Sequence, residues 1–227
     1  PLATTPLRSE LPEVIKVDNP VKKVAFFTGC TMNFIYVDAG KAVVDVLKNN
    51  NVEVVIPKDQ HCCGMPILAH GDSDTAKEMA RSHVDTFSKL DVEYIITACG
   101  SCGTTFNRHY LELLEDDPVY YDKAKKIADK IIDISDFIVK VIGLDESKLG
   151  TVNMRVTYHD PCHLNRGMGV KDSPRQILKA IPGIEFVEMK HADRCCGSAG
   201  SFSLTHYDLS MAIHKHKIDN IKATKAD

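Results

Sequence analysis

The stretch VAFFTGC, residues 24–30, contains the pattern on which the whole chain is built. Its first four residues are apolar and rich in β-branched and aromatic types, which predicts a buried strand, and a two-residue turn then leads to Cys30. The stretch VTYHDPC, residues 156–162, has the same order of strand, turn and cysteine. We therefore predict an internal repeat in which a cysteine lies just past the carboxyl end of a strand.

The repeat continues after each of these cysteines. In the first copy 31 residues separate Cys30 from the triplet Cys62-Cys63-Gly64, and in the second copy 32 residues separate Cys162 from Cys195-Cys196-Gly197. Chance is the weaker explanation for two such triplets at matched spacing. We predict two copies of one domain, about 132 residues apart.

The first copy holds one further pair of cysteines. Cys99-Gly100-Ser101-Cys102 begins after 35 more residues and directly follows an apolar run at 94–97. The same spacing places the matching pair of the second copy at about position 232, beyond Asp227. We expect the chain to stop just short of its last strand and its last cysteine pair, with natural loss of those ligands as the alternative.

Strand-like and helix-like segments alternate along the chain. Short runs rich in β-branched and aromatic residues predict strands at 24–27, 52–56, 94–97, 154–158 and 184–187. Helical spacing of apolar residues predicts helices at about 33–49, 73–90, 103–115, 120–142, 173–181 and 203–222. This alternation predicts an α/β protein of two pseudo-symmetric Rossmann-like halves, each a parallel sheet flanked by helices.

The domain boundaries follow from the same pattern. Residues 1–20 contain four prolines and little periodicity, so we expect a tail or linker. The first cysteine-containing domain is then expected at 21–145 and the second at 146–227, truncated before its last strand and its Cys-x-x-Cys pair. The glycines and charges of 143–153 mark the expected boundary.

Composition narrows the class of function. With 28 Lys and Arg against 31 Asp and Glu, the net charge of −3 argues against nucleic acid as the main partner. Neither a leader nor a membrane-length apolar run is visible, so we expect a cytoplasmic protein, bound to the inner face of a membrane only through its partners. Eight cysteines in such a chain indicate metal binding or redox chemistry rather than disulfides.

The cysteines of the first copy follow three predicted strands. Because the carboxyl ends of parallel strands meet at one edge, we expect five thiols to converge there: Cys30, Cys62, Cys63, Cys99 and Cys102. A closed zinc site uses four ligands, whereas iron–sulfur clusters are held by dispersed cysteine thiolates. The fifth thiol either bridges an expanded cluster or lies free beside it. A zinc site that uses four of the five, or a set of buried structural thiols, remains as an alternative.

The second copy has fewer candidate ligands. Cys162, Cys195 and Cys196 are either ligands that await missing partners or vestigial thiols. Four histidines and two arginines lie beside the cysteine loops: His61, His159, His163, His191, Arg166 and Arg194. The histidines are candidates to donate hydrogen bonds to sulfur or relay protons, and the arginines to screen negative charge. Each of them is also consistent with an ordinary turn or surface residue. The apolar positions within 119–141 read as core packing.

These motifs resemble the cysteine-rich CCG domain family. The segments Gly29-Cys30-Thr31, 61–66, 159–164 and 195–200 carry the resemblance, which covers about residues 21–227. That family includes a subunit of heterodisulfide reductase and the iron–sulfur subunits of glycolate oxidase and lactate utilisation complexes. The resemblance to heterodisulfide reductase implies a noncubane [4Fe–4S] cluster held by all five cysteines of the first copy, and leaves the second, incomplete site in doubt.

The resemblance implies a function in electron transfer. We expect an iron–sulfur subunit of a flavin-linked hydroxyacid dehydrogenase complex of the glycolate or lactate type, with a flavoprotein and other iron–sulfur subunits as partners and quinone or another carrier as acceptor. The chain has no Gly-x-Gly-x-x-Gly after a strand, so hydride chemistry is expected to belong to a partner. The alternatives are catalytic reduction of a disulfide at the cluster, and a zinc-stabilised scaffold.

Overall fold

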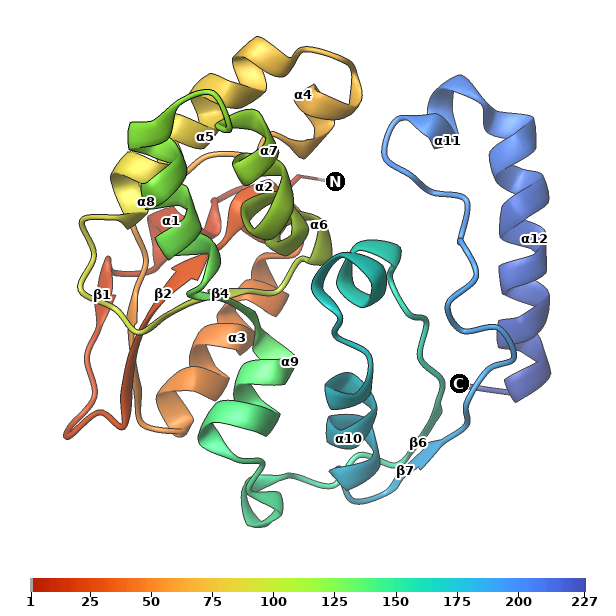
Figure 1. Cartoon of the computed structure of the whole chain (residues 1–227). Helices are drawn as coiled ribbons and strands as arrows, with labels where there is room; N and C mark the ends of the chain where they lie inside the picture. The colour runs from red at the N-terminus through yellow and green to blue at the C-terminus, as the bar shows by residue number, and fades with distance from the viewer. Residues whose placement is uncertain (1) are drawn as a thin grey trace. The chain divides into compact units, whose positions relative to one another are not determined.

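The computed structural model describes residues 2–227, which form two compact units. Unit 1 extends to Phe137, and unit 2 comprises Ile138–Asp227. The division therefore falls earlier than the expected boundary between 145 and 146. The reason is that the chain leaves the first sheet directly after its last strand. Figure 1 shows the helices and strands of both units.

Unit 1 is built on a five-stranded sheet. Its strands are β1 (Val14–Ile15), β2 (Lys22–Phe27), β3 (Val52–Val55), β4 (Tyr94–Thr97) and β5 (Ile131–Asp133). Their order is β1-β3-β2-β4-β5, and all neighbours run parallel except β1, which pairs antiparallel with β3. The predicted strands β2, β3 and β4 are confirmed, and so is the α/β class.

The central strands are buried on both faces. In β2 the side chains of Val24, Ala25 and Phe26 have no exposed surface, and in β4 the same holds for Ile95 and Ile96. Such continuous apolar runs are typical of parallel sheets covered by helices on both sides. Figure 1 shows α3 on one side of the sheet and α5 with α8 on the other.

The helices of unit 1 connect these strands. They are α1 (Leu7–Glu10), α2 (Gly29–Phe34), α3 (Val37–Asn49), α4 (Met65–Ala69), α5 (Ser73–Phe87), α6 (Gly100–Thr104), α7 (Tyr110–Leu113), α8 (Pro118–Ala128) and α9 (Ile134–Asp136), with π-helical turns at Thr105–His109 and Phe137–Ile142. The predicted start of α5 is confirmed, because the Asp72 carboxylate accepts a hydrogen bond from the N–H of Thr75 at 3.0 Å.

The prediction of a single helix at 120–142 is wrong. The chain forms α8, then the strand β5, then α9, because Ile131 and Ile132 pair with Ile95 and Ile96 of β4. Apolar residues at helical spacing also suit a short strand when β-branched residues fall next to an open sheet edge. The Asp133 carboxylate then accepts a hydrogen bond from the N–H of Ser135 at 2.9 Å and starts α9.

The N-terminal segment differs from the expected tail or linker. Leu7 of α1 is fully buried, and β1 pairs with β3 through Val14 and Val55. The backbone N–H of Arg8 also donates to Oδ1 of Asn33 at 3.0 Å. The described residues of this segment therefore belong to unit 1. Its prolines bound short elements instead of marking a linker.

Unit 2 has a smaller sheet. The parallel strands β6 (Met154–Val156) and β7 (Ile184–Phe186) pair with each other, and the helices are α10 (Asp172–Ala180), α11 (Phe202–Thr205) and α12 (Tyr207–Thr224). A 3₁₀ turn lies at Glu146–Lys148 and a π-helical turn at His163–Gly167. The order of strands, cysteine turns and helices is the one that the repeat predicts. A two-fold relation between the units stays a prediction.

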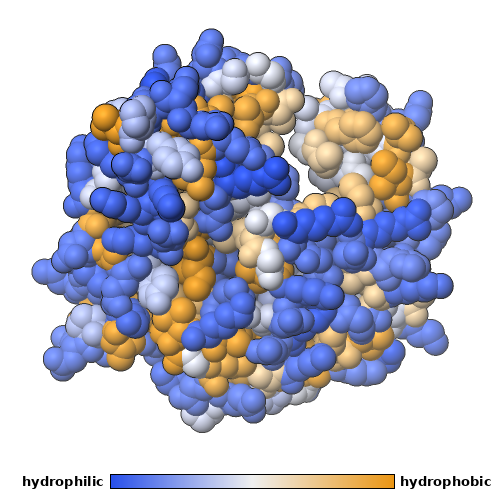
Figure 2. All heavy atoms as spheres, in the orientation of Figure 1, coloured by the Kyte–Doolittle hydropathy of each residue, from blue (hydrophilic) through white to orange (hydrophobic). Residues whose placement is uncertain are grey.

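Exposed apolar side chains gather on the last two helices. Figure 2 shows hydrophobic surface over α11 and the first turns of α12. Leu204 is 83% exposed, and Tyr207, Leu209 and Met211 are exposed as well. Unit 2 therefore keeps apolar surface in contact with solvent next to its cysteine loops.

Candidate functional site

Five thiols gather where three strands of unit 1 end. Cys30 lies in α2 after β2, Cys62 and Cys63 lie in the loop after β3, and Cys99 and Cys102 lie at the start of α6 after β4. Because β3, β2 and β4 are parallel neighbours, their carboxyl ends share one edge of the sheet. We call these five residues the first cysteine group.

The side chains of this group contact one another. The thiol of Cys63 interacts with the thiols of Cys62 and Cys102, and the thiol of Cys102 interacts with that of Cys99. Cys30 interacts electrostatically with Cys62. The approach is close, since a Cβ added at Gly29 would lie 3.2 Å from Sγ of Cys102. The structure therefore brings together the five cysteines that the sequence predicts.

The contacts favour a thiolate at Cys63. Hydrogen bonds from the thiols of Cys102 and Cys62 lower the pKa of Cys63 to about 3, although the residue is buried. The pKa values of Cys62 and Cys102 rise because both thiols donate to Cys63. The interaction with Cys102 also lowers the pKa of Cys99 to about 7. The thiolate is the form that binds metals, so the group is prepared to act as a ligand set.

Gln60 ties the loop of Cys30 to the loop of Cys62 and Cys63. Its side chain is buried, and Oε1 accepts from the N–H of Thr28 at 2.9 Å. Nε2 donates to the carbonyl oxygens of Phe26 at 3.1 Å and Pro57 at 3.0 Å. One amide side chain therefore satisfies backbone groups at the ends of both strands, which fixes the two loops against each other.

A buried histidine and tyrosine support the Cys63 backbone. The N–H of His61 donates to Nε2 of His83 at 3.2 Å, so the ring proton of His83 is on Nδ1, 2.7 Å from the hydroxyl of Tyr110. That hydroxyl donates to the carbonyl oxygen of Cys63 at 2.9 Å. Burial, and then the charge of His61, lowers the pKa of His83 to about 3, so the ring is neutral at neutral pH.

His83 and Tyr110 are absent from the candidates drawn from the sequence. His83 lies on the buried face of α5 with Ala76, Ala80, Val84 and Phe87. A polar residue within that apolar stripe is a signal that sequence reading can use, because a buried imidazole needs hydrogen-bond partners. For Tyr110 we find no comparable signal.

The histidines and arginines named from the sequence lie in the expected loops. The His61 ring contacts the His83 ring with centroids 3.9 Å apart and the planes tilted by 37°. Nδ1 of His159 lies 3.1 Å from the carbonyl oxygen of Ala192. His191 adopts a positive φ of 55° in the turn before the second cysteine pair. Arg166 faces Asp193 at 3.9 Å, and Arg194 is exposed. His163 follows Cys162 at the start of the π-helical turn. Proton relay and charge screening by these residues stay predictions.

Unit 2 gathers its three cysteines in the same way. We call Cys162, Cys195 and Cys196 the second cysteine group. The thiol of Cys162 is hydrogen-bonded to Cys195, and burial, followed by the charges of Cys195 and Cys196, raises the pKa of Cys162. The N–H of Gly197 donates to Sγ of Cys195 at 3.3 Å. The second group is therefore a cluster of thiols, of which Cys195 is exposed.

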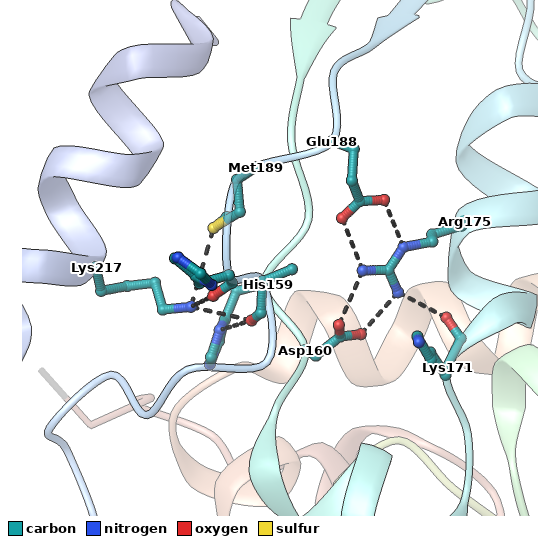
Figure 3. A network of polar contacts seen from close by, with 9 residues as sticks. His159, Asp160, Lys171, Arg175, Glu188, Met189 and Lys217 are labelled. Carbon is teal, nitrogen blue, oxygen red and sulfur yellow. Dashed lines mark hydrogen bonds and ion pairs between the residues drawn. The ribbon is translucent and has the colours of Figure 1, made fainter.

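A network of ion pairs holds the loop before Cys162. The guanidinium of Arg175 lies between two carboxylates (Figure 3): it donates to Asp160 at 2.7 and 2.9 Å and to Glu188 at 2.7 and 2.8 Å. Asp160 is 2% exposed. The network joins the turn that precedes Cys162 to the chain that follows β7.

Gly197 is expected to tolerate no side chain. Its φ is +86°, and an added Cβ would lie 2.5 Å from the backbone oxygen of Ser210 in α12. We predict that Gly197→Ala destabilises unit 2 by about 3 kcal/mol or more, because a left-handed alanine and a backbone clash act together. The measurement is amide hydrogen exchange of α12, followed peptide by peptide.

Gly200→Ala is the matched control for this prediction. Gly200 also has a positive φ, +59°, but an added Cβ meets nothing within 4 Å. Only the backbone cost of about 1 kcal/mol is therefore expected. Equal effects of the two substitutions would show that the contact with Ser210 is unimportant.

The donor set fits an iron–sulfur cluster. All the donors are cysteine sulfurs, the soft ligands that iron–sulfur clusters and zinc prefer. Within residues 2–227, no three Cys, His, Asp or Glu side chains are grouped closely enough to hold a single metal ion. Five thiols from three loops match the dispersed cysteine ligands that iron–sulfur clusters use.

Comparison with known proteins agrees with this chemistry. The sequence profile of the cysteine-rich domain named CCG matches residues 24–107 and 156–227. The chain is 38% identical over 216 residues to the probable glycolate oxidase iron-sulfur subunit of Bacillus subtilis, covering 95% of this chain and 48% of that protein. It is 36% identical over 205 residues to lactate utilization protein A of the same organism, covering 90% of this chain and 84% of that protein.

A methanogen protein is similar as well. It is a subunit of the fumarate reductase (CoM/CoB) of Methanothermobacter marburgensis, 38% identical over 209 residues, covering 92% of this chain and 40% of that protein. The chain thus spans less than half the length of this relative and of the glycolate oxidase relative. Within residues 2–227, each helix is too short or too polar to cross a bilayer.

Proposed function

This chain belongs to the CCG cysteine-rich domain family, and from that premise we propose that it is an iron–sulfur electron-transfer subunit of a redox complex. The observation that carries the proposal is the contact among the thiols of Cys62, Cys63, Cys99 and Cys102 at one edge of the sheet, with Cys30 beside them. When bound there, an iron–sulfur cluster supplies one-electron oxidation and reduction.

The finer proposal is a [4Fe–4S] cluster in a flavin-linked hydroxyacid dehydrogenase. The names of two relatives, a glycolate oxidase iron-sulfur subunit and a lactate utilization protein, support this substrate class. The partners would be a flavoprotein, which performs the hydride chemistry, and further iron–sulfur subunits. The acceptor would be a quinone at a membrane surface or another carrier. Five thiols support a noncubane cluster, because an ordinary cubane uses four.

Anaerobic metal analysis of the full chain tests the proposal. We expect iron and acid-labile sulfide in similar amounts, a paramagnetic resonance signal on reduction, and reoxidation of the reduced chain by a soluble quinone. A colourless chain with zinc and no sulfide would overturn the redox function and favour the scaffold. Iron and sulfide without any reoxidation by a quinone or a partner protein would overturn electron transfer.

Disulfide reduction is the second candidate. The coenzyme M and coenzyme B named for the methanogen relative are thiols, which favours disulfide chemistry in that protein. For this chain, Cys30, Cys62 and Cys99 of the first group are partly exposed, and partly exposed thiols are accessible to a disulfide. Turnover that depends on an added disulfide, in the absence of a flavoprotein, would favour this candidate over electron transfer alone.

A further inference from the structure

Unit 2 contains a buried ammonium group beside its cysteine loops. Lys217 of α12 is 2% exposed. Its Nζ donates to the carbonyl oxygens of His191 at 3.0 Å and Ala192 at 2.9 Å, and it faces Sδ of Met189 at 3.9 Å (Figure 3). Three acceptors match the three N–H bonds of an ammonium, whereas a neutral amine has only two. The hydrogen bonds therefore match a cation with neutral partners, although burial lowers the pKa of Lys217.

The hydrogen bond from Lys217 to Ala192 lies where the loop before Cys162 meets the loop before Cys195. The carbonyl oxygen of Ala192 accepts from Nζ of Lys217 and also from the backbone N–H of Asp160 at 3.0 Å. Nδ1 of His159 lies 3.1 Å from the same oxygen. The carbonyl group of Ala192, to which Lys217 donates, therefore connects the turn before Cys162 with the turn before Cys195.

The charge of Lys217 is available to the thiols. Arg175 binds both Asp160 and Glu188, and Arg166 faces Asp193, so these carboxylates have cations of their own. Lys217 interacts electrostatically with Cys196, Asp193, Asp160 and Cys162. A thiolate at Cys196 or Cys162 therefore lies in the field of this cation, together with the two carboxylates.

Unit 1 has a neutral group at the corresponding place. His83 lies twenty residues after Cys63, and Lys217 lies twenty-one residues after Cys196. Both are buried, both belong to the long helix that follows the Cys-Cys-Gly triplet, and both contact the turn just before it. His83 accepts a backbone hydrogen bond at Nε2, which a doubly protonated ring cannot do.

We propose that Lys217 is a positioning residue that places a positive charge beside the second cysteine group. The second group then favours anionic species over neutral ones, whether these are thiolates or molecules that approach them. A cluster bound at this group would be stabilised in its reduced, more negative state relative to the same cluster in a chain without this charge. That last consequence alone rests on the proposed function.

Two thiol reagents of different charge test the proposal in the metal-free, reduced, full-length chain. The probes are 5,5′-dithiobis(2-nitrobenzoate), a dianion, and 4,4′-dithiodipyridine, which is neutral. In each reaction a cysteine thiolate attacks the reagent disulfide, forms a mixed disulfide and releases the reagent thiolate. Mass spectrometry measures the labelling rate of each cysteine, and the readout is the ratio of the anionic to the neutral rate.

We expect the ratio at Cys195 and Cys196 to depend on the charge of Lys217. Lys217→Met should lower the ratio for unit 2 about threefold at low salt, because one nearby charge is lost. Lys217→Arg, which keeps the charge, should preserve it. Lys215→Met, at an exposed position of the same helix, is the matched control and should change nothing.

A purely structural role for Lys217 gives a different result. Loosening of the loop would raise both labelling rates together and leave their ratio unchanged. An unchanged ratio in Lys217→Met would therefore overturn the proposal. If that variant fails to fold, the ratio is measured in the unmodified chain as salt is raised, and a ratio at Cys195 and Cys196 that does not fall with salt would overturn the proposal instead. None of these measurements requires a cluster, so failure of the proposed function would not be mistaken for failure of this inference.

Discussion

Replacing Cys63 by serine is expected to remove the iron of the cluster that we propose for the first cysteine group. Cys63 is the thiol that Cys62 and Cys102 both contact, and its thiolate is stabilised by their hydrogen bonds. Serine offers a hard oxygen that iron–sulfur clusters do not favour. Loss of a residue beside a metal ligand already costs about 10-fold or more in affinity, so loss of the central ligand should lower iron content by about tenfold at least.

The measurement is iron and sulfide per chain after anaerobic production, together with the paramagnetic resonance signal. Cys63 is 3% exposed, and serine is similar in size, so the fold should persist and circular dichroism should confirm it. Cys162→Ser changes a thiol of the second group and should leave the signal of the first group intact. Full retention of iron and signal in both Cys62→Ser and Cys63→Ser would refute the assignment of these ligands.

The sequence predicted the part of the fold that lies at the centre of the first sheet. Strands β2, β3 and β4 are buried on both faces, so their residues form continuous apolar runs that stand out from the helices. The convergence of Cys30, Cys62 and Cys99 could be predicted as well, because parallel neighbouring strands end at one edge of the sheet. In β2, β3 and β4 the apolar sequence pattern and the burial in the folded chain therefore agree.

The elements at the sheet edges could not be predicted in this way. β1 has two residues and β5 has three, too few to establish a period. Whether Ile131 and Ile132 continue a helix or join β4 depends on which partner is nearby in space. Pairing with β4 decided the structure of this segment, whereas the helical spacing of its apolar residues favoured the wrong alternative.

The supporting side chains were missed for a related reason. His83, Tyr110 and Lys217 belong to helices, where a polar residue is usually read as exposed or as ordinary core. Their role depends on burial against a loop that is distant in sequence. The chemistry-bearing cysteines can be read from spacing, but the groups that orient them are identified only from the hydrogen bonds of the folded chain.

Replacing Arg175 by methionine is expected to destabilise unit 2 by about 4 kcal/mol, close to a thousandfold in the opening equilibrium. Arg175 donates two hydrogen bonds to Asp160, and it lies over the Tyr158 ring at 5.1 Å. Methionine preserves much of the apolar stem but leaves the 2%-exposed carboxylate of Asp160 without its cation. An unpaired buried charge costs more than the ion pair contributes.

Amide hydrogen exchange distinguishes a loss of stability in unit 2 from one in unit 1, because peptides of β6, α10 and β7 report on unit 2 alone. Arg166→Met is the matched control: its ion pair with Asp193 is exposed and 3.9 Å long, so a change of about 0.5 kcal/mol or less is expected. Adding Asp160→Asn to Arg175→Met should recover a large part of the stability, since the buried charge is then absent. If the double variant is no more stable than the single one, the loss comes from packing around the Arg175 stem. The stability of the turn before Cys162 would then depend on that packing and not on the ion pair.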